Sequence, residues 1–311
     1  MRHMGDVLAG IHASWEFESD AVFIRFERGI RTPKLFQALG ERHVPHEALA
    51  SVTLTPGKRG TVVLHAEPRR GADPLMEAAA GQLPEGSDPY RLVLPAERET
   101  LAEYYRDELR ERLVDGRGGY DGTGGYDGRG GYDGYGGTGD EPGGGFLVAA
   151  PQGPQSFKAY DGAASFDGAS EVSFRWFWTG ASSEKWKAGD QTFAVRDLSG
   201  VEWRSPDVFD GYLRLLPRSA EPRPAQADQD PAAVVFGLGY GPVHKSLPFA
   251  AAVLAAIRGA GRTPAPVDAL PEARDPAGVA ERIRHLGELH AAGLVTDDEF
   301  AAKKAELLAE L

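Results

Sequence analysis

Two stretches decide the fold: WEFESDAVFIRF at residues 15–26 and ASFDGASEVSFRW at residues 164–176. Each contains two runs of alternating apolar and polar residues, separated by a short polar turn. Val22, Ile24 and Phe26 recur with a period of two, as do Val172 and the aromatic residues that follow it. Alternation of β-branched and aromatic residues is typical of half-buried strands, so each stretch predicts a β-hairpin.

The similarity between the two stretches extends over a longer unit. Phe17 and Phe166 lie 149 positions apart, and Val52 and Val201 have the same separation. Each unit continues through strands and a Pro-containing loop to a last strand and a helix. We expect these at residues 91–94 and 96–113 in the first unit, and at 233–238 and 247–258 in the second. The order predicts a duplicated, curled antiparallel sheet or barrel, covered at its open end by an amphipathic helix.

The segment between the units, residues 115–145, is rich in Gly, Tyr and Asp. It repeats GGYDG three times with a period of six and contains no Val, Ile, Leu or Met. Such a chain buries too little apolar surface to offset the entropy of ordering, so we predict a disordered linker that allows two domains to move independently. Its Tyr and Arg residues leave weak self-association as an alternative to a plain tether.

The two units resemble a bacterial PH-like (pleckstrin-homology-like) domain family of unknown function. The matching features are Phe17–Val22, Leu49–Val52 and the strand and helix from Arg91; in the second unit they are residues 166–174, 197–203 and 233–258. The resemblance implies two tandem copies, each a seven-stranded sheet closed by one helix, with a short helical C-terminal domain. It implies no catalytic residues.

Residues 278–311 predict a helical hairpin. Val279, Ile283, Leu286 and Leu289 form the stripe of an amphipathic helix, and Gly293 follows at a suitable stop. A capping box begins the second helix at residues 296–299.

The run at residues 283–308 resembles the SHOCT (short C-terminal) domain, which implies oligomerisation or partner docking. Two short helices form too small a core to stand alone, so the apolar stripe should pack on a second copy or a partner; docking within the same chain remains the alternative. The candidate interaction residues are Ile283, Leu286, Leu289, Leu294, Phe300, Leu307 and Leu308.

The charge and cysteine content narrow the function. The chain has no Cys, which excludes disulfides and thiol catalysis, and a net charge of −12. The linker and the tail from residue 275 carry −4 each, whereas residues 1–114 and 146–274 carry −3 and −1. We therefore expect no nucleic-acid partner and disfavour membrane association. The nearest basic cluster, residues 25–34, fits a solvated strand end better than a binding face. No apolar run is long enough to span a membrane, and we expect a soluble cytoplasmic protein.

Several motifs do not support catalysis. The glycines at residues 237–241 lack the third glycine of a dinucleotide fingerprint, because Pro242 stands there. Ser182 and Lys185 have the spacing of acyl-serine enzymes, but the partner motifs of those enzymes are missing. The eight His residues are scattered and make no metal site. Trp176 and Trp178 are expected on one face of a strand. Such a face more often belongs to the hydrophobic core than to an aromatic groove that binds a ligand.

Together these patterns predict an α+β, mainly β protein with two PH-like antiparallel barrels, each closed by a C-terminal helix, and a C-terminal two-helix hairpin. The expected segments are 1–114 (first barrel), 115–145 (linker), 146–262 (second barrel), 263–277 (Pro-rich linker) and 278–311 (hairpin). The expected function is a non-enzymatic adaptor without cofactor or metal, which binds protein partners through the barrels and self-associates through the hairpin. The alternative is a peripheral membrane or lipid-headgroup module.

Overall fold

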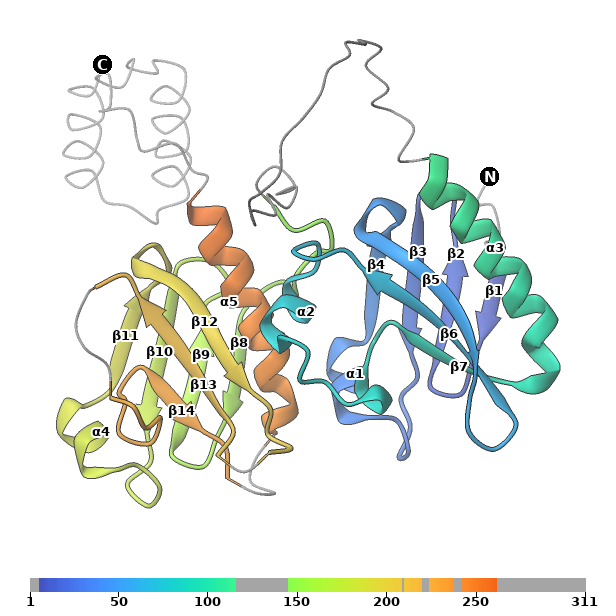
Figure 1. The fold of residues 1–311 in the computed structure, drawn as a ribbon. Coiled ribbons are helices and arrows are strands. Elements are labelled where there is room, and N and C mark those ends of the chain that lie inside the picture. Colours follow the sequence, from blue (N-terminus) through green and yellow to red (C-terminus); the bar gives the residue numbers. More distant parts are fainter. Residues whose placement is uncertain (1–5, 116–144, 209, 220–223, 238–241, 262–311) are drawn as a thin grey trace, which may run out of the picture. The chain divides into compact units, whose positions relative to one another are not determined.

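The computed structural model describes residues 6–115, 145–208, 210–219, 224–237 and 242–261. All of these described residues belong to one compact unit. The described part is mainly β, with some helices, and its strands form four antiparallel sheets (Figure 1). The predictions for residues 116–144, for the Pro-rich segment and for the C-terminal hairpin fall outside the described residues.

The first copy contains a four-stranded and a three-stranded sheet, in the orders β1-β2-β3-β4 and β5-β6-β7. Its strands are β1 (Asp6–Ala9), β2 (Ala13–Phe17), β3 (Ala21–Phe26), β4 (Glu41–Pro45), β5 (Leu49–Pro56), β6 (Thr61–Pro68) and β7 (Arg91–Pro95). Its helices are α1 (Lys34–Leu39), α2 (Pro74–Ala79) and α3 (Glu99–Asp115), with 3₁₀ turns at His46–Ala48, Glu85–Ser87 and Ala96–Arg98.

The second copy repeats this arrangement, with the sheet orders β11-β10-β9-β8 and β12-β13-β14. Its strands are β8 (Gln155–Lys158), β9 (Gly162–Phe166), β10 (Glu171–Trp176), β11 (Gln191–Ala194), β12 (Leu198–Arg204), β13 (Tyr212–Pro217) and β14 (Ala233–Val235). Its helices are α4 (Ser183–Ala188) and α5 (Ser246–Ala260), with 3₁₀ turns at Val195–Asp197 and η6 (Val243–Lys245).

Fine details confirm the predicted duplication. The β5–β6 ladder is interrupted between Leu49 and Ser51, and the β12–β13 ladder between Leu198 and Gly200, 149 positions later. The short helices α1 and α4 end at Gly40 and Gly189, which have φ angles of +67° and +70°. Glycine adopts this left-handed backbone without steric cost, which explains its presence at both helix ends.

The predicted hairpins are present in both copies. Phe17 pairs with Val22 across β2 and β3, and Phe166 pairs with Val172 across β9 and β10. The alternating residues of β3 and β10 face the two cores, as their period of two requires.

Other expectations need correction. Within the described residues no ladder joins the two sheets of a copy, so the predicted closed barrels are not formed. The sheets instead meet at a corner, where the N–H of Ile11 donates to Val93 O (2.9 Å) and that of Tyr160 donates to Val235 O (3.1 Å). The helix expected from residue 96 begins with a 3₁₀ turn, and the strand expected at 233–238 ends at Val235.

The two terminal helices differ in burial. α3 packs on its own copy through a single stripe, Ala102, Tyr105 and Leu109, and Tyr105 stacks on Phe17 with ring centroids 4.1 Å apart. α5 is buried over most of its circumference from Ser246 to Val253. The additional burial of α5 comes from the first copy, whose helix α2 packs against it.

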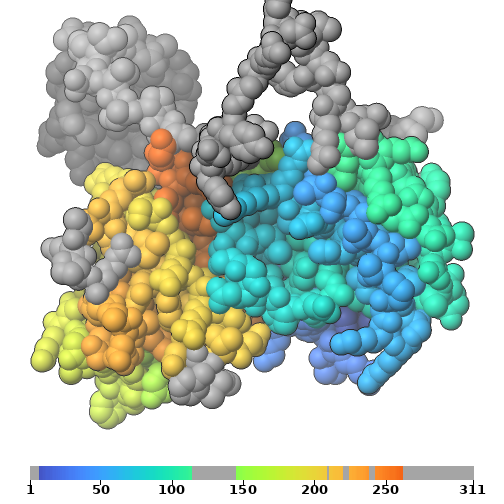
Figure 2. Space-filling view, in the orientation of Figure 1, coloured from blue at the N-terminus to red at the C-terminus, as the bar shows by residue number. Residues whose placement is uncertain are grey.

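The contact between the copies centres on α2, for which the second copy has no counterpart among the described residues. Leu75, Ala78 and Ala79 of α2 belong to the hydrophobic core of the second copy. Glu77 pairs with Arg258 of α5 at 2.5 Å. Figure 2 shows the cyan surface around α2 against the yellow and orange surface of the second copy. The linker composition predicted two domains able to move independently; the structure instead packs the two copies together through α2.

Candidate functional site

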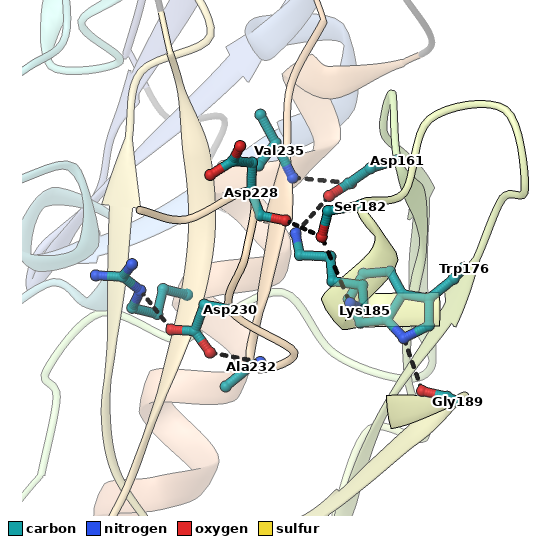
Figure 3. Close-up of polar contacts among 10 residues, drawn as sticks. Asp161, Trp176, Ser182, Lys185, Gly189, Asp228, Asp230, Ala232 and Val235 are labelled. Carbon is teal, nitrogen blue, oxygen red and sulfur yellow. Dashed lines mark hydrogen bonds and ion pairs between the residues drawn. The ribbon is translucent and has the colours of Figure 1, made fainter. Parts of the chain in front are cut away.

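A buried ion pair of the second copy joins α4 to the turn between β8 and β9 (Figure 3). Lys185 of α4 has no exposed surface, and Asp161, in the turn between β8 and β9, is 2% exposed. The Lys185 Nζ atom lies 2.5 Å from Asp161 Oδ2, and Asp161 Oδ1 accepts the N–H of Val235 at 2.9 Å. The pair therefore ties α4 to β14 through the corner where the two sheets meet.

The surroundings of Lys185 shift the pKa of both members of the pair. Burial lowers the pKa of Lys185, and the Asp161 carboxylate opposes that shift; burial raises the pKa of Asp161, opposed by Lys185. The ammonium also lies 4.9 Å from the ring centre of Trp176, whose indole N–H donates to Gly189 O at 2.7 Å. Removal of either partner would leave a buried charge without compensation.

Ser182 gives the first turn of α4 its cap. Its hydroxyl accepts the N–H of Lys185 at 3.4 Å and donates to Asp228 O at 2.7 Å. The Ser-x-x-Lys spacing therefore reflects a helix cap followed by a buried lysine. Both polar side chains are engaged in contacts within the copy.

A second polar feature recurs in both copies. Asp230 Oδ1 accepts the N–H of Ala232 at 2.8 Å, and Asp88 Oδ1 accepts that of Tyr90 at 2.9 Å. Each aspartate also faces a basic residue on the neighbouring strand. Asp230 Oδ2 lies 2.9 Å from Arg214 Nε of β13; the two atoms form an ion pair, but their geometry is not that of a hydrogen bond. Asp88 Oδ2 lies 3.2 Å from His65 Nε2 of β6. Both copies therefore have, before their last strand, a turn in which an aspartate side chain accepts the backbone N–H two residues later.

The first copy places a cavity where the second places its ion pair. Counting 149 positions back, Phe36 stands at the place of Lys185 and His12 at that of Asp161. Phe36 stacks on Phe26 at 4.5 Å, much as Lys185 lies against Trp176. A cavity of about 170 Å³ remains beside them. Its lining is mostly apolar, with charged side chains at the rim, and comprises His12, Ala13, Pro33, Phe36, Glu85, Gly86, Asp88, Arg91, Leu92 and Val93.

The first copy has a buried polar centre of its own at a different place. Asp73 accepts from Arg42 Nη2 at 2.7 Å and from the Tyr90 hydroxyl at 2.8 Å. It also caps α2 by accepting the N–H of Leu75 at 2.9 Å. Burial and the Asp73 carboxylate raise the pKa of Tyr90 well above its usual value, so Tyr90 remains a hydrogen-bond donor. This centre fixes the helix through which the copies meet.

A groove of about 450 Å³ follows the junction of the copies. One wall is α2 and the residues after it; the other consists of β12 and β13. The lining residues are Glu77, Ala78, Ala80, Gln82, Val201, Glu202, Trp203, Arg204, Tyr212 and Leu216. β12 is an edge strand of its sheet. Gln82 spans the groove with both ends of its amide, donating to Trp203 O at 2.8 Å and accepting the N–H of Ser205 at 3.1 Å.

The structure separates the two tryptophans that the sequence placed together. Trp176 is buried in the core, whereas Trp178 is 81% exposed, because β10 ends at Trp176 and Trp178 lies in the following turn. They do not share a strand face. The candidate interaction residues Ile283, Leu286, Leu289, Leu294, Phe300, Leu307 and Leu308 lie outside the described residues.

Sequence reasoning missed the groove and both buried centres. Asp73 before Pro74 carries a recognisable signal, since an aspartate preceding a proline often caps a helix. Lys185 carries none, because lysine is rarely buried, and only the alignment with Phe36 shows that it occupies a core position. Gln82 contacts residues more than 120 positions away, which no local pattern reveals.

The fold and the repeated sites define a tandem-repeat protein with two mainly β copies joined through an inserted helix. A family model for a domain of unknown function, DUF4429, matches residues 15–110 and again residues 164–254. Together the matches cover more than half of the chain, which therefore belongs to the DUF4429 family. A model for the short C-terminal domain, SHOCT, matches residues 281–308. Comparison with curated proteins found no match, and comparison with solved structures found none.

None of the helices in the described residues is both long enough and apolar enough to traverse a bilayer.

Proposed function

We propose that the chain is a non-enzymatic adaptor that binds a protein partner in the groove between its DUF4429 copies and self-associates through its SHOCT segment. The observation that carries the proposal is the composite groove, whose walls come from both copies. A site of this kind requires the tandem arrangement, because α2 of the first copy forms one wall.

The expected partner segment is an extended peptide that runs along β12. An edge strand offers backbone N–H and C=O groups to a further strand. The side-chain amide of Gln82 already hydrogen-bonds to two backbone groups of this region, the C=O of Trp203 and the N–H of Ser205. Glu202 and Arg204 lie beside it and would select for complementary charges on the peptide.

The buried charges support a role without catalysis. Lys185 and Arg42 are the kinds of residue that serve enzymes, but each is engaged by an aspartate inside its copy. Lys185 has no exposed surface for a substrate to reach.

We also propose that each copy is PH-like. Support comes from its division into four-stranded and three-stranded sheets, followed by a terminal helix that packs on the fifth strand. An experimental structure superimposed on PH domains would test this assignment.

Peptide binding is testable with a random-peptide display selection against the full chain. The proposal expects peptides whose binding is weakened at least tenfold by Glu202→Lys or Val201→Pro, since these change the charge of the groove and its edge strand. Leu101→Ala, on the distant α3, serves as the control with unchanged affinity. Selected peptides that are indifferent to both groove substitutions would contradict the proposed site.

Self-association is tested separately by light scattering of the full chain and of its Leu286→Asp and Leu289→Asp variants. The proposal expects an oligomer that dissociates in both variants. A monomeric mass for the unsubstituted chain would remove the self-association claim.

A further inference from the structure

The loop between β3 and α1 carries the most exposed of the large apolar side chains in the described residues. Ile30 has 106% of its reference surface exposed. Hydrogen bonds nevertheless hold the conformation of the loop: the N–H of Thr32 donates to Gly29 O at 3.1 Å. The Gln37 side chain donates to the same Gly29 O at 3.0 Å and to Thr32 O at 2.9 Å. A built turn therefore holds Ile30 away from the protein at its tip.

Basic residues surround this isoleucine. Arg28 and Arg31 flank it in the sequence, and Lys34 begins α1; Glu27 is the one acidic residue between positions 27 and 34. Helix α1 packs against η6 of the second copy. Burial, followed by the charges of Lys34 and Lys245, lowers the pKa of His244 in η6. We call Arg28, Ile30, Arg31, Lys34 and Lys245 the basic edge.

The second copy presents an exposed apolar residue in the equivalent loop. Trp178 follows β10, is 81% exposed, and occupies a turn closed by the N–H of Gly180 donating to Phe177 O at 3.1 Å. Trp186 on α4 is also 58% exposed. Figure 1 shows α1 and α4, which follow these two loops, toward the lower end of the view. The packed copies thus display two separate apolar anchors and a basic cluster.

We propose that the basic edge binds the surface of an anionic lipid membrane, with Ile30 and Trp178 entering the headgroup region. Large apolar and aromatic side chains stabilise contact with that region, and tryptophan is enriched there. Basic residues near an anionic leaflet strengthen binding. The two exposed tips come from different copies, and the basic residues beside Ile30 complement an anionic surface. The near-neutral copies and the acidic tail disfavoured membrane contact. Three basic residues nevertheless lie between positions 28 and 34, and the contact between α1 and η6 adds Lys245.

The test is co-flotation of the full chain with phosphatidylcholine vesicles, with and without phosphatidylglycerol at about 30%. We expect binding to the anionic vesicles and at least tenfold weaker binding to the neutral ones. Each basic residue contributes about fivefold, so the double variant R28Q/R31Q should bind about 25-fold more weakly. Ile30→Ala should reduce binding by about tenfold or more, through the loss of inserted apolar surface.

The controls separate membrane contact from damage to the fold. Leu101→Ala removes a 42% exposed apolar residue on α3, outside the basic edge, and should leave binding unchanged. All variants should keep the circular dichroism spectrum and unfolding midpoint of the parent chain. Anionic vesicles should also shift the tryptophan fluorescence to the blue, and Trp178→Phe should reduce that shift.

Equal recovery with neutral and anionic vesicles would overturn the inference, as would unchanged binding by R28Q/R31Q. The absence of binding to either vesicle would likewise refute the lipid assignment, and a protein partner would then be the expected ligand of the exposed Ile30. These outcomes do not bear on the peptide groove, which is assayed without lipid through Glu202 and Val201.

Discussion

The two DUF4429 copies share strand order, bulge position and helix-ending glycines, yet they stabilise their interiors differently. The first copy buries Arg42, Asp73 and Tyr90 together around the start of α2, and the second buries Lys185 against Asp161 at the start of α4. Where the second copy has its lysine, the first has Phe36 and a cavity. The duplicated backbone therefore tolerates a change in the location of its buried charge, provided that each charge keeps its partner.

The copies also differ in what their terminal helices contact. α5 is covered by α2 of the first copy, while α3 keeps Leu101 and Tyr104 exposed, at 42% and 58%. The insertion that forms α2 thus converts two similar modules into one body. The Asp73 centre is part of that conversion, because it caps the inserted helix.

The largest effect is expected from Asp73→Asn. The substitution removes the charge that compensates Arg42, which is buried, and weakens the bonds to Tyr90 and to the cap of α2. Loss of one partner of a buried pair typically costs about 3–5 kcal/mol, and we expect the free energy of unfolding in urea to fall by that amount. Asp107→Asn, which breaks the exposed pair with Arg106, is the matched control and should change it by less than about 0.5 kcal/mol. Equal effects of the two variants would contradict the role given to the buried centre.

A smaller loss, about 3 kcal/mol, is expected from Lys185→Phe. Asp161 is left unpaired, but it can take up a proton, since its pKa is already raised by burial. Adding Asp161→His gives both positions the residues found in the first copy and should recover part of the lost stability, because an imidazole nitrogen can accept the N–H of Val235. Urea unfolding of the single and double variants measures this. A double variant less stable than Lys185→Phe would show that the two copies are not interchangeable at this position.

Gln82→Ala tests the junction. It deprives Trp203 O and the N–H of Ser205 of their partner, which we expect to cost about 1–2 kcal/mol. Because the loss falls between the copies, calorimetry should show the unfolding transition broaden or split. Gln37→Ala removes a comparable amide within the first copy and should leave a single transition. If both variants split the transition, the effect of Gln82→Ala would not be specific to the junction.

The smallest effect concerns pH. Burial, followed by the charge of Arg112, lowers the pKa of His46, whose equivalent in the second copy is Val195. As the pH falls below about 6.5, the unfolded chain binds the proton first, so stability decreases until the lower pKa of the folded state is reached. His46→Val should therefore flatten the fall in unfolding free energy between about pH 7 and pH 5. An identical slope in parent and variant would show that His46 does not contribute.

Periodicity predicted the parts of the fold that depend on local patterns. The β2–β3 and β9–β10 hairpins followed from alternating apolar residues, and the repeat itself followed from the constant spacing. Helices α1, α2 and α4 have six residues each, too few for a helical period to stand out. Trp178 was misplaced because alternation continues in the sequence after the strand has ended.

The candidate sites were less predictable, for physical reasons. A buried lysine looks like a surface residue until its aspartate, 24 positions earlier, is brought beside it. The groove depends on α2 meeting β12, a contact between segments far apart in the sequence, and Lys245 joins the basic edge only because α1 meets η6. Local propensity carries no information about such encounters.

The central claim, that α2 joins the copies by packing on α5, is tested most directly by cross-linking. The chain contains no cysteine, so Glu77→Cys and Arg258→Cys introduce a unique pair where the two side chains are 2.5 Å apart. We expect a short bismaleimide to link the two positions within one chain in high yield, and the pair Lys58→Cys with Arg258→Cys, in the β5–β6 turn and on α5, to remain unlinked. Absence of an intramolecular link between positions 77 and 258, in a variant that retains its fold, would contradict the central claim.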